Sequence, residues 1–461
     1  MAASPSSSTS SSSASPAYYQ TSSITQMNED HLLPILCLLP LDSIISFSMT
    51  CRRFRSLSSS EVIWEGICRR EWGSGAVDAL LDSLSSHERR EVCWKRLYQR
   101  ISQVNLLSCK RLFNRDGNFP TPRASQSLNF VSDCLILFGG GSQGGRHLDD
   151  TWVAQIGNRL DSFLSWKQVG SGTPSGRFGH TCTIVGSDLV LFGGINDHGI
   201  RHSDTWVGRV IQDGSSGIKV SWRLLDAEPV VPPARGAHAA CCIGEQQILI
   251  HGGMGQNGLR LNDTWMLDLS DNHHASWHQI VHTRPSPSAR SGHSITWIGD
   301  KRIVLFGGRG AGYEALNDLW ILDIGEENPK WNELTYESSS LVSEMPLPRV
   351  GHSATMLMGR KILVYGGEDS LRHRKGDFWV LDVGSILRFL TTGLKKNLRR
   401  MWRKLQVEGL CPNYRSFHSA CADLGGCRVY VFGGMVDGVV HPGEAYGLRF
   451  DGELYLLEFL I

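Results

Sequence analysis

The sequence predicts a mainly β protein, a six-bladed β-propeller preceded by a small all-α domain and a helical linker. A pair of adjacent glycines ends a short apolar strand six times, at intervals of roughly 54 to 67 residues. Each interval holds four short apolar runs, a repeat typical of a propeller blade. The residues before the first repeat instead carry apolar side chains at helical spacing. The glycine pairs begin at Gly139, Gly193, Gly252, Gly307, Gly366 and Gly433.

The composition is that of an ordinary soluble protein. Of 461 residues, 41% are hydrophobic and the formal net charge is +1, which favours neither nucleic acid nor a membrane as a partner. No apolar run is long enough to span a bilayer. The 12 cysteines show no paired Cys-x-x-Cys spacing. We therefore expect reduced thiols, no metal site and a location in the nucleus, the cytoplasm or both.

The first part of the chain changes character at residue 27. Residues 1–26 are predicted to be a disordered tail, because serine dominates them and they contain neither an apolar run nor arginine. Residues 27–73 have a helical pattern, in which Leu32, Leu36 and Leu39 share one face and Pro40 ends the first helix. So small a block cannot bury all of its apolar side chains, which predicts a partner for some of them.

This helical block resembles an F-box. The resemblance is carried by the runs at residues 35–42, 50–54, 62–65 and 69–73. It implies docking on the Skp adaptor of an SCF (Skp, cullin, F-box) ubiquitin ligase, and through the adaptor on the cullin. A plain helical hairpin that packs on the propeller is the alternative. The residues expected to form or support the adaptor interface are Leu36, Leu39, Pro40, Ile44, Cys51, Phe54 and Trp64.

Residues 74–107 are predicted to be a rigid helical linker, because Trp94, Leu97 and Ile101 lie on one helix face. The propeller is expected to cover residues 108–461. Units one to five each end in a fourth strand, whereas the sixth has no such strand after it. Folded sheets avoid an unpaired edge. We therefore expect Ser108 to Phe113 to form the outer strand of the sixth blade.

The repeated residues favour a structural role over catalysis. Five repeats open with Arg-x-x-His and five contain Asp-x-Trp after a loop. The aspartate can accept backbone N–H bonds, and the tryptophan can pack between adjacent blades. The pattern is of the kelch type, whose known enzymatic use, a copper-radical oxidase, would gather His and Tyr at one site. Histidines spread one per blade predict no enzyme and no cofactor.

The arginine that opens each repeat leaves two interpretations open. In several kelch proteins this position resembles a rim residue at the mouth of the central channel, where unpaired arginines would bind an acidic or phosphorylated target. Paired with loop aspartates, the arginines would only stabilise the ring. Further arginines in the loops, such as Arg260, again favour an acidic ligand. The candidate target-binding residues are Arg123, Arg177, Arg235, Arg290, Arg309, Arg349 and Arg415.

Residues 384–400 form an insertion in the fifth repeat that suits an amphipathic helix. Four basic residues, Lys395, Lys396, Arg399 and Arg400, accompany it. A solvated surface helix, a docking helix and a nuclear-import signal all fit this pattern.

Both parts together resemble a plant F-box/kelch-repeat protein, and the repeats look closest to the light-sensing F-box/kelch family of the plant clock. The Gly-x-Asn-Cys-Arg-Phe-Leu motif of the flavin-binding domain does not occur, so light sensing is not implied. The resemblance implies a non-catalytic receptor that holds an unknown target protein on the propeller while the F-box docks the ligase. The alternative function is a kelch scaffold outside a ubiquitin ligase.

Overall fold

The structure is a computed structural model that describes residues 24–114, 117–156, 163–213, 217–227, 230–270, 275–282, 284–325, 327–335, 345–393, 401–438 and 447–459. The tail predicted for residues 1–26 lies almost wholly outside these residues. By its internal contacts the chain divides into two compact units, residues 1–67 and 68–461. The predicted linker is therefore part of the larger unit, and the division falls before the predicted end of the F-box at residue 73.

The first unit is helical. After a short 3-10 helix (Ile24–Gln26) it contains α1 (Glu29–Leu38), α2 (Leu41–Ser48), α3 (Arg52–Leu57) and the start of α4 (Glu61–Trp72). Pro40 separates α1 from α2, and the Cys51 thiol caps α3 by accepting a hydrogen bond from the Phe54 N–H. The rings of Phe47 and Phe54 stack with their centroids 3.9 Å apart. The centre of this unit is therefore apolar.

The larger unit begins with the end of α4, and three linker helices follow: α5 (Ser74–Ser83), α6 (Ser86–Arg90) and α7 (Trp94–Ser102). The Trp72 ring stacks on Tyr98, with centroids 5.7 Å apart. From the propeller, Arg360 Nε donates to the Glu71 carbonyl over 2.9 Å, and Arg403 Nη1 donates to the side chain of Asn105 over 2.8 Å. The contacts of Arg360 and Arg403 join the end of α4 and the end of the linker to the propeller. The rigidity of the linker stays a prediction.

Most strands belong to small antiparallel sheets. The first contains β2 (Ser127–Val131), β3 (Cys134–Phe138), β6 (Thr151–Gln155) and β8 (Trp166–Gly170). The second contains β9 (Thr181–Val185), β10 (Asp188–Phe192), β11 (Thr205–Asp213) and β12 (Gly217–Leu224). The third contains β13 (Arg235–Gly236), β14 (Ala239–Ile243), β15 (Gln247–Gly255), β16 (Arg260–Asp268) and β17 (Ser276–Ile280). The fourth contains β18 (Arg290–Ser291), β19 (Ser294–Gly299), β20 (Arg302–Gly310), β21 (Ala315–Asp323) and β22 (Lys330–Glu333).

The last two repeats share one ten-stranded sheet. The fifth repeat supplies β23 (Ser353–Leu357), β24 (Lys361–Tyr365), β25 (Phe378–Asp382) and β26 (Trp402–Gly409). The sixth supplies β27 (Arg415–Ser416), β28 (Ser419–Ala422), β29 (Arg428–Gly438) and β30 (Gly447–Phe459). Because one sheet serves two repeats, the division of the protein into six separate blades stays a prediction.

Strand β1 (Leu106–Asn114) joins the two halves of this sheet. It runs antiparallel to β30, from Leu107 opposite Phe459 to Leu112 opposite Leu454. Its first residues also run parallel to β26. The strand that precedes the first repeat thus pairs with the last strand of the sixth, as the missing fourth strand predicted. Its far end pairs with the short strand β7 (Phe163–Leu164).

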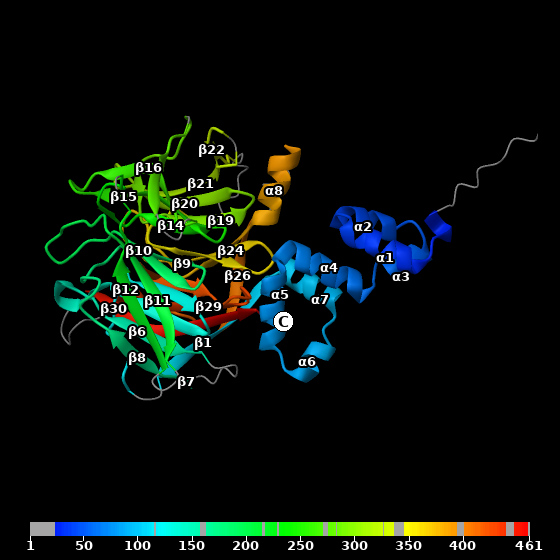
Figure 1. Ribbon diagram of the computed structural model, residues 1–461, viewed down its shortest axis with the longest axis horizontal. Helices are drawn as coiled ribbons and strands as arrows, with labels where there is room; N and C mark the ends of the chain where they lie inside the picture. Colours follow the sequence, from blue (N-terminus) through cyan, green and yellow to red (C-terminus); the bar gives the residue numbers. More distant parts are fainter. Residues whose placement is uncertain are drawn as a thin grey trace, which may run out of the picture. The chain divides into compact units, whose positions relative to one another are not determined.

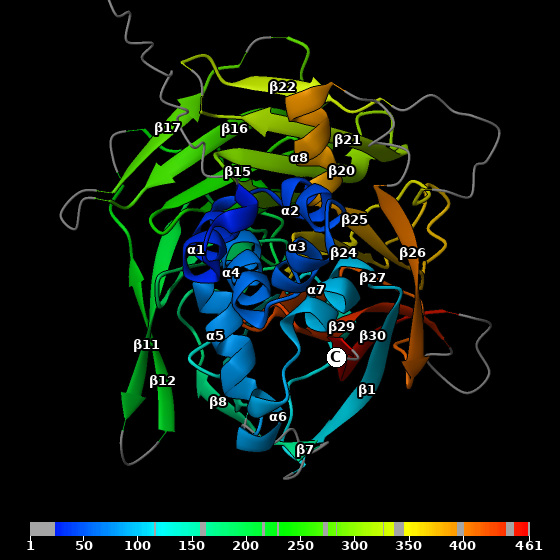
Figure 2. The same cartoon turned by 90° about the vertical axis from the view of Figure 1, so that its right-hand side faces the viewer.

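The repeats meet around a common centre (Figures 1 and 2). One residue of each repeat donates its backbone N–H to the carbonyl of the corresponding residue in the preceding repeat, and all six have φ between 53° and 67°. The cycle closes between the first and last repeats, where the Ser125 N–H donates to the Phe417 carbonyl over 2.8 Å. Every repeat therefore belongs to one closed ring of hydrogen bonds. Its members are Ser125, Gly179, Ala237, Gly292, Gly351 and Phe417.

The glycine pairs allow successive repeats to approach closely. Gly139 has φ of 65°, and a Cβ there would lie 2.9 Å from the Arg177 carbonyl oxygen of the next repeat. The tryptophans of the fourth strands pack between adjacent sheets, a place that the sequence predicted for the tryptophan of Asp-x-Trp. Trp222 packs on Phe138 and Trp277 on Phe192, with centroids 5.3 and 5.0 Å apart. Adjacent repeats thus share one apolar core.

The insertion of the fifth repeat begins as helix α8 (Val383–Thr392). Ile386 is fully buried in the cluster that contains Trp402, so this helix is amphipathic and packs on the propeller. The four basic residues of the predicted docking or import signal lie outside the described residues.

Candidate functional site

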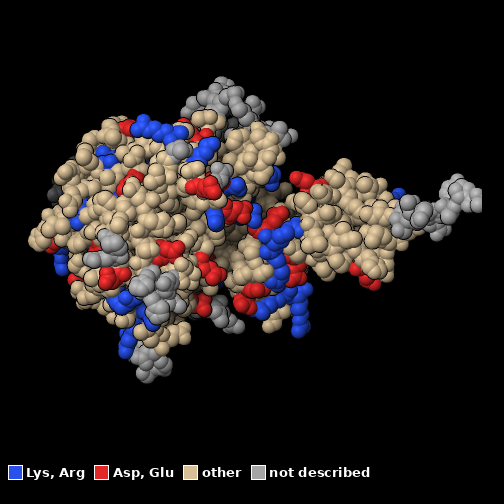
Figure 3. All heavy atoms as spheres, turned by 45° about the horizontal axis from the view of Figure 1, so that its top comes forward, with Lys and Arg blue, Asp and Glu red and all other residues tan. Residues whose placement is uncertain are grey.

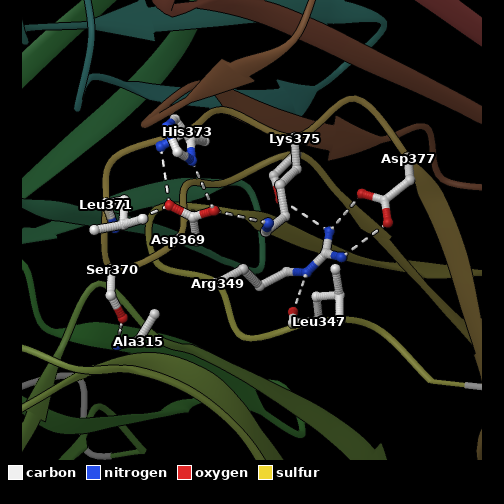
Figure 4. Close-up of polar contacts among 10 residues, drawn as sticks. Ala315, Leu347, Arg349, Asp369, Ser370, Leu371, His373, Lys375 and Asp377 are labelled. Carbon is white, nitrogen blue, oxygen red and sulfur yellow. Dashed lines mark hydrogen bonds and ion pairs between the residues drawn. The ribbon is translucent and has the colours of Figure 1, made fainter. Parts of the chain in front are cut away.

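The arginine that opens each repeat is buried, with 0 to 1% of its surface exposed. In the first repeat, Arg123 Nη1 and Nη2 donate to the two carboxylate oxygens of Asp150 over 2.6 and 2.9 Å, and Nη1 also reaches the Gly139 carbonyl. Figure 4 shows the same arrangement in the fifth repeat, where Arg349 lies between the Asp377 carboxylate and the Leu347 carbonyl. The aspartates of the six pairs are Asp150, Asp204, Asp263, Asp318, Asp377 and Asp451.

This burial corrects the expectation that these arginines contact a target. A fully buried guanidinium whose donors are already used cannot reach a ligand unless the ring opens. The prediction therefore fails for Arg123, Arg177, Arg235, Arg290, Arg349 and Arg415, and the alternative, pairing with loop aspartates, describes the structure. Burial alone would raise the pKa of Asp150, but the hydrogen bonds and positive charge of Arg123 lower it, so the pair is ionised.

The repeated histidines are also part of the ring. Each ring is buried, and Nε2 meets a side chain of the preceding repeat, such as Ser127 for His180 at 3.2 Å and Thr181 for His238 at 2.8 Å. Burial and then the neighbouring Arg177 lower the pKa of His180 to about 3, so this histidine is neutral. Burial and contact with the preceding repeat agree with a structural role for these histidines.

The third repeat departs from this pattern. Ala239 stands where the other repeats supply a hydroxyl, and it cannot accept a hydrogen bond. His251 takes over, with its Nδ1 3.0 Å from His293 Nε2. His251 occupies the position that Phe138 and Phe192 have in other repeats. The histidine in place of phenylalanine thus supplies the hydrogen-bond partner that is lost with alanine in place of serine or threonine.

Arg260 and Arg309 are among the residues that line the central cavity, which has a volume of about 350 Å³. Arg309 Nη2 donates to Glu368 Oε1 over 3.0 Å, and the second oxygen of Glu368 accepts from the Ser416 hydroxyl. Arg374 lies 3.7 Å from Glu368 and 2.8 Å from Asp437. Of the predicted target-binding arginines, only Arg309 lines this cavity.

Arg260 also lines this cavity, although the sequence predicted it only as a loop arginine and not as a target-binding residue. Its Nε donates to the Ser291 hydroxyl over 3.3 Å, and its guanidinium lies over the Tyr313 ring, 4.5 Å from the centroid. The sequence contained an indication of this position. Arg260 lies three residues before the aspartate of Asp-x-Trp, as Arg201 and Arg374 do in other repeats.

The predicted adaptor residues fall into two groups. Leu36, Ile44, Phe54 and Trp64 are buried in the helical block, with 7% or less of their surface exposed. Pro40 and Cys51 are exposed, and Leu39 is half-buried.

Sequence reasoning missed the most exposed apolar residues of the block. Leu38 is 82% exposed, Met49 73% and Val62 62%, and Ile35 and Ile45 are also exposed. In the space-filling view the helices α1 to α3 present few charged side chains on the visible face (Figure 3). Most residues of helix α1 are apolar, on the face that packs in the block and on the opposite face as well. This pattern in the sequence could have indicated that the exposed face also needs a partner.

The described residues contain no cluster of three or more His, Cys, Asp or Glu side chains arranged to hold a metal ion. Within the same part of the chain, no helix has the length and apolar character needed to cross a membrane.

Comparison with known proteins matches both parts of the chain. Residues 24–66 match the F-box domain, and residues 216–343 and 332–446 match the KLHDC2/KLHL20/DRC7 kelch-repeats domain. The chain is 50% identical over 465 residues to an F-box/kelch-repeat protein of Arabidopsis thaliana, covering 97% of this chain and 95% of that one.

Two Adagio proteins are more distant relatives. Adagio-like protein 1 of Oryza sativa subsp. japonica is 28% identical over 90% of this chain, and Adagio protein 3 of Arabidopsis thaliana is 29% identical over 94%. The alignments cover 63% and 65% of the lengths of these two proteins.

Proposed function

The chain belongs to the F-box/kelch-repeat proteins, and from this membership we propose that it is the substrate-recognition subunit of an SCF-type ubiquitin ligase. Its F-box docks the Skp adaptor, and through it the cullin, while the propeller binds the target protein. The protein contributes positioning, and the covalent chemistry belongs to other subunits.

The observation that carries the proposal is the set of exposed apolar side chains on the matched F-box. Leu38, Met49 and Val62 each expose more than half of their surface. Exposed apolar surface in excess of what a small block can bury marks a protein interaction site. The adaptor would cover them, while Leu36, Ile44 and Phe54 hold the helices that present them.

The linker supports the same function. Positioning a target requires a receptor that transmits a defined geometry rather than a free tether. Helix α7 leads directly into β1, and Arg403 of the propeller donates to the Val104 carbonyl at the end of the linker. The end of the linker that joins the propeller is thus held by hydrogen bonds and by strand pairing.

The proposal is tested by co-purifying the full chain with the Skp adaptor. Leu38→Asp and Met49→Asp each place a charge in the expected interface and should weaken adaptor binding by at least about tenfold. Far-UV circular dichroism should remain that of the wild type, because both side chains are exposed in the free protein.

Leu371→Asp is the matched control, because Leu371 is 77% exposed on a propeller loop and should not affect the adaptor. Wild-type affinity in both F-box variants would contradict the assigned surface. A folded wild-type chain that does not bind the adaptor at all would favour the alternative, a kelch scaffold outside a ligase.

A further inference from the structure

The boundary between the fifth and sixth repeats lacks the tryptophan found at the other five. At each of those, the tryptophan of a fourth strand packs on an aromatic ring of the neighbouring repeat, as Trp166 packs on Phe432. Strand β1 takes the place of the fourth strand in the sixth repeat. Its Cys109 lies opposite Leu457, at the position where Trp166 lies in the first repeat. A cysteine that is 4% exposed therefore occupies the place of an indole ring.

The chain that leaves β26 packs tightly against Cys109. Gly409, the last residue of β26, lies opposite Cys109, and a Cβ at Gly409 would lie only 2.2 Å from the Cys109 carbonyl oxygen. The Leu410 N–H donates to the same oxygen over 3.0 Å. The Cys411 N–H then donates back to the Gly409 carbonyl over 3.1 Å. This turn places Cys411 beside β1.

Tyr365 holds the same segment from its other side. It precedes a glycine pair, as Phe138 does in the first repeat. Its hydroxyl donates to the carbonyls of Pro412 and Asn413 over 3.3 and 2.9 Å. The backbone is therefore fixed both before and after Cys411.

The two thiols interact with each other. The Cys109 thiol donates to the sulfur of Cys411, whose own S–H donates to the Val407 carbonyl 3.7 Å away. Both cysteines are free thiols, Cys109 buried and Cys411 exposed. An exposed thiol can react with an oxidant from solution, and a second thiol in contact with it can then displace the product as a disulfide.

We propose that Cys109 and Cys411 are a site of reversible disulfide formation, with a low-molecular-weight disulfide such as oxidised glutathione as the oxidant. The Cys411 thiolate attacks one sulfur of that disulfide and displaces one glutathione thiolate. The Cys109 sulfur then attacks Cys411, displaces the second glutathione and gives up its proton to it. Two protein thiols are oxidised, and one glutathione disulfide is reduced to two thiols.

The protonation of both cysteines makes this reaction slow. Burial raises the pKa of Cys109 to about 12, Cys411 adds to the rise, and the charge of Arg415 opposes it. Burial also raises the pKa of Cys411, whereas the hydrogen bond from Cys109 lowers it. Because the thiolate is the reacting species, the pair responds to sustained rather than brief oxidation.

The bond would close the ring covalently. It joins the strand that follows linker helix α7 to a residue 411 − 109 = 302 positions later. A cross-link over so long a loop restricts the unfolded chain, so it favours the folded ring. It forms within the larger unit and does not require that the F-box binds the adaptor, so it goes beyond the proposed function and is tested separately.

The test treats the purified full-length protein with oxidised glutathione at pH 8, blocks the remaining thiols and maps tryptic peptides without reduction. Trypsin cuts after Lys and Arg, so Cys109 lies in residues 101–110 and Cys411 in residues 405–415, each without a second cysteine. We expect these two peptides to be linked and dithiothreitol to separate them. In urea, the equilibrium constant for unfolding of the oxidised protein should be at least about tenfold lower than that of the reduced protein.

Cys411→Ser is the informative variant, because Cys411 is exposed and its replacement should leave the fold intact. The variant should not form the cross-link, and oxidised glutathione should leave its unfolding constant unchanged. Cys242→Ser is the matched control at a half-buried cysteine of the third repeat. It should form the cross-link like the wild type.

Three results would each overturn the proposal. The first is a glutathione adduct that stays on Cys411 without the cross-link. The second is a disulfide between Cys109 or Cys411 and a different cysteine. The third is that both remain free thiols while other cysteines of the protein react.

Discussion

Arg290 and Asp318 form a two-pronged ion pair inside the ring, with Nη1 and Nη2 each 2.7 Å from a carboxylate oxygen. Arg290→Ala removes one charge and leaves the aspartate unpaired in a largely buried place. We expect the free energy of unfolding to fall by about 3 to 5 kcal/mol, as measured by urea denaturation. Replacing both residues, as in Arg290→Met with Asp318→Leu, should cost less than the single substitution.

Target or peptide binding by folded Arg290→Ala should remain at the wild-type level. Weak capture with unchanged stability would show that Arg290 contacts the ligand after all.

The buried histidines predict that acid weakens the ring. Burial lowers the pKa of His180 to about 3, whereas the unfolded side chain has its ordinary value of 6.5. Between these values the unfolded chain binds more protons, so the stabilising contribution is complete above about pH 6.5 and is lost as the pH falls toward 3. Each such histidine contributes up to about 1.4 kcal/mol per pH unit.

His180→Gln tests this effect, because Gln126 takes the equivalent place in the first repeat and donates to the Phe432 carbonyl. The difference in unfolding free energy between pH 7 and pH 5 should be smaller in this variant than in the wild type. His198→Gln, at an exposed histidine, should leave that difference unchanged.

The pair of His251 and His293 predicts a rescue experiment. His251→Phe restores the side chain found in other repeats but leaves His293 Nε2 without a partner, at a cost of about 1 to 3 kcal/mol. Adding Ala239→Ser supplies the hydroxyl that those repeats use, and should recover most of the lost stability. Thermal unfolding of the two variants measures both effects, and equal melting temperatures would contradict the hydrogen-bonding role of His251.

The pairing of strand β1 predicts where the shortest chain that still folds as a propeller begins. A chain that begins at Asn105 keeps the pairing of β1 with β30 and should unfold cooperatively. A chain that begins at Gly117 lacks it and exposes the β30 edge, so it should aggregate or lose cooperative unfolding. Light scattering and circular dichroism distinguish the two, and identical behaviour would show that β1 is dispensable.

Periodicity and strand counting predicted much of this fold. The glycine pairs located the repeats, and the missing fourth strand of the last repeat predicted the partner of β30. The burial of the arginines could not be predicted in this way. A repeat pattern shows that residues are equivalent, but it does not show how far their side chains lie from solvent. A signal was present, since Arg123 and Asp150 are separated by the same 27 residues as Arg177 and Asp204.

The candidate sites were harder to predict for a related reason. Ile44 and Leu38 are both apolar and both near the start of the F-box, but one is 1% and the other 82% exposed. Leu38 lies at the end of α1 and Ile44 on α2, so only the packing of these two helices in the folded block separates them. Likewise, Arg260 differs from Arg309 through the position of Glu368, which comes from a distant part of the sequence.

The pairing of β1 with β30 has a consequence for the synthesis of the protein. About 340 residues separate the two strands, and at ribosomal rates of roughly 5 to 20 residues per second they take roughly 17 to 70 s to make. During that interval β1 has left the ribosome without its antiparallel partner, while the helices before it are already complete. The nascent chain therefore presents a folded helical block first and then an unpaired strand edge, and such an edge favours aggregation until β30 is made.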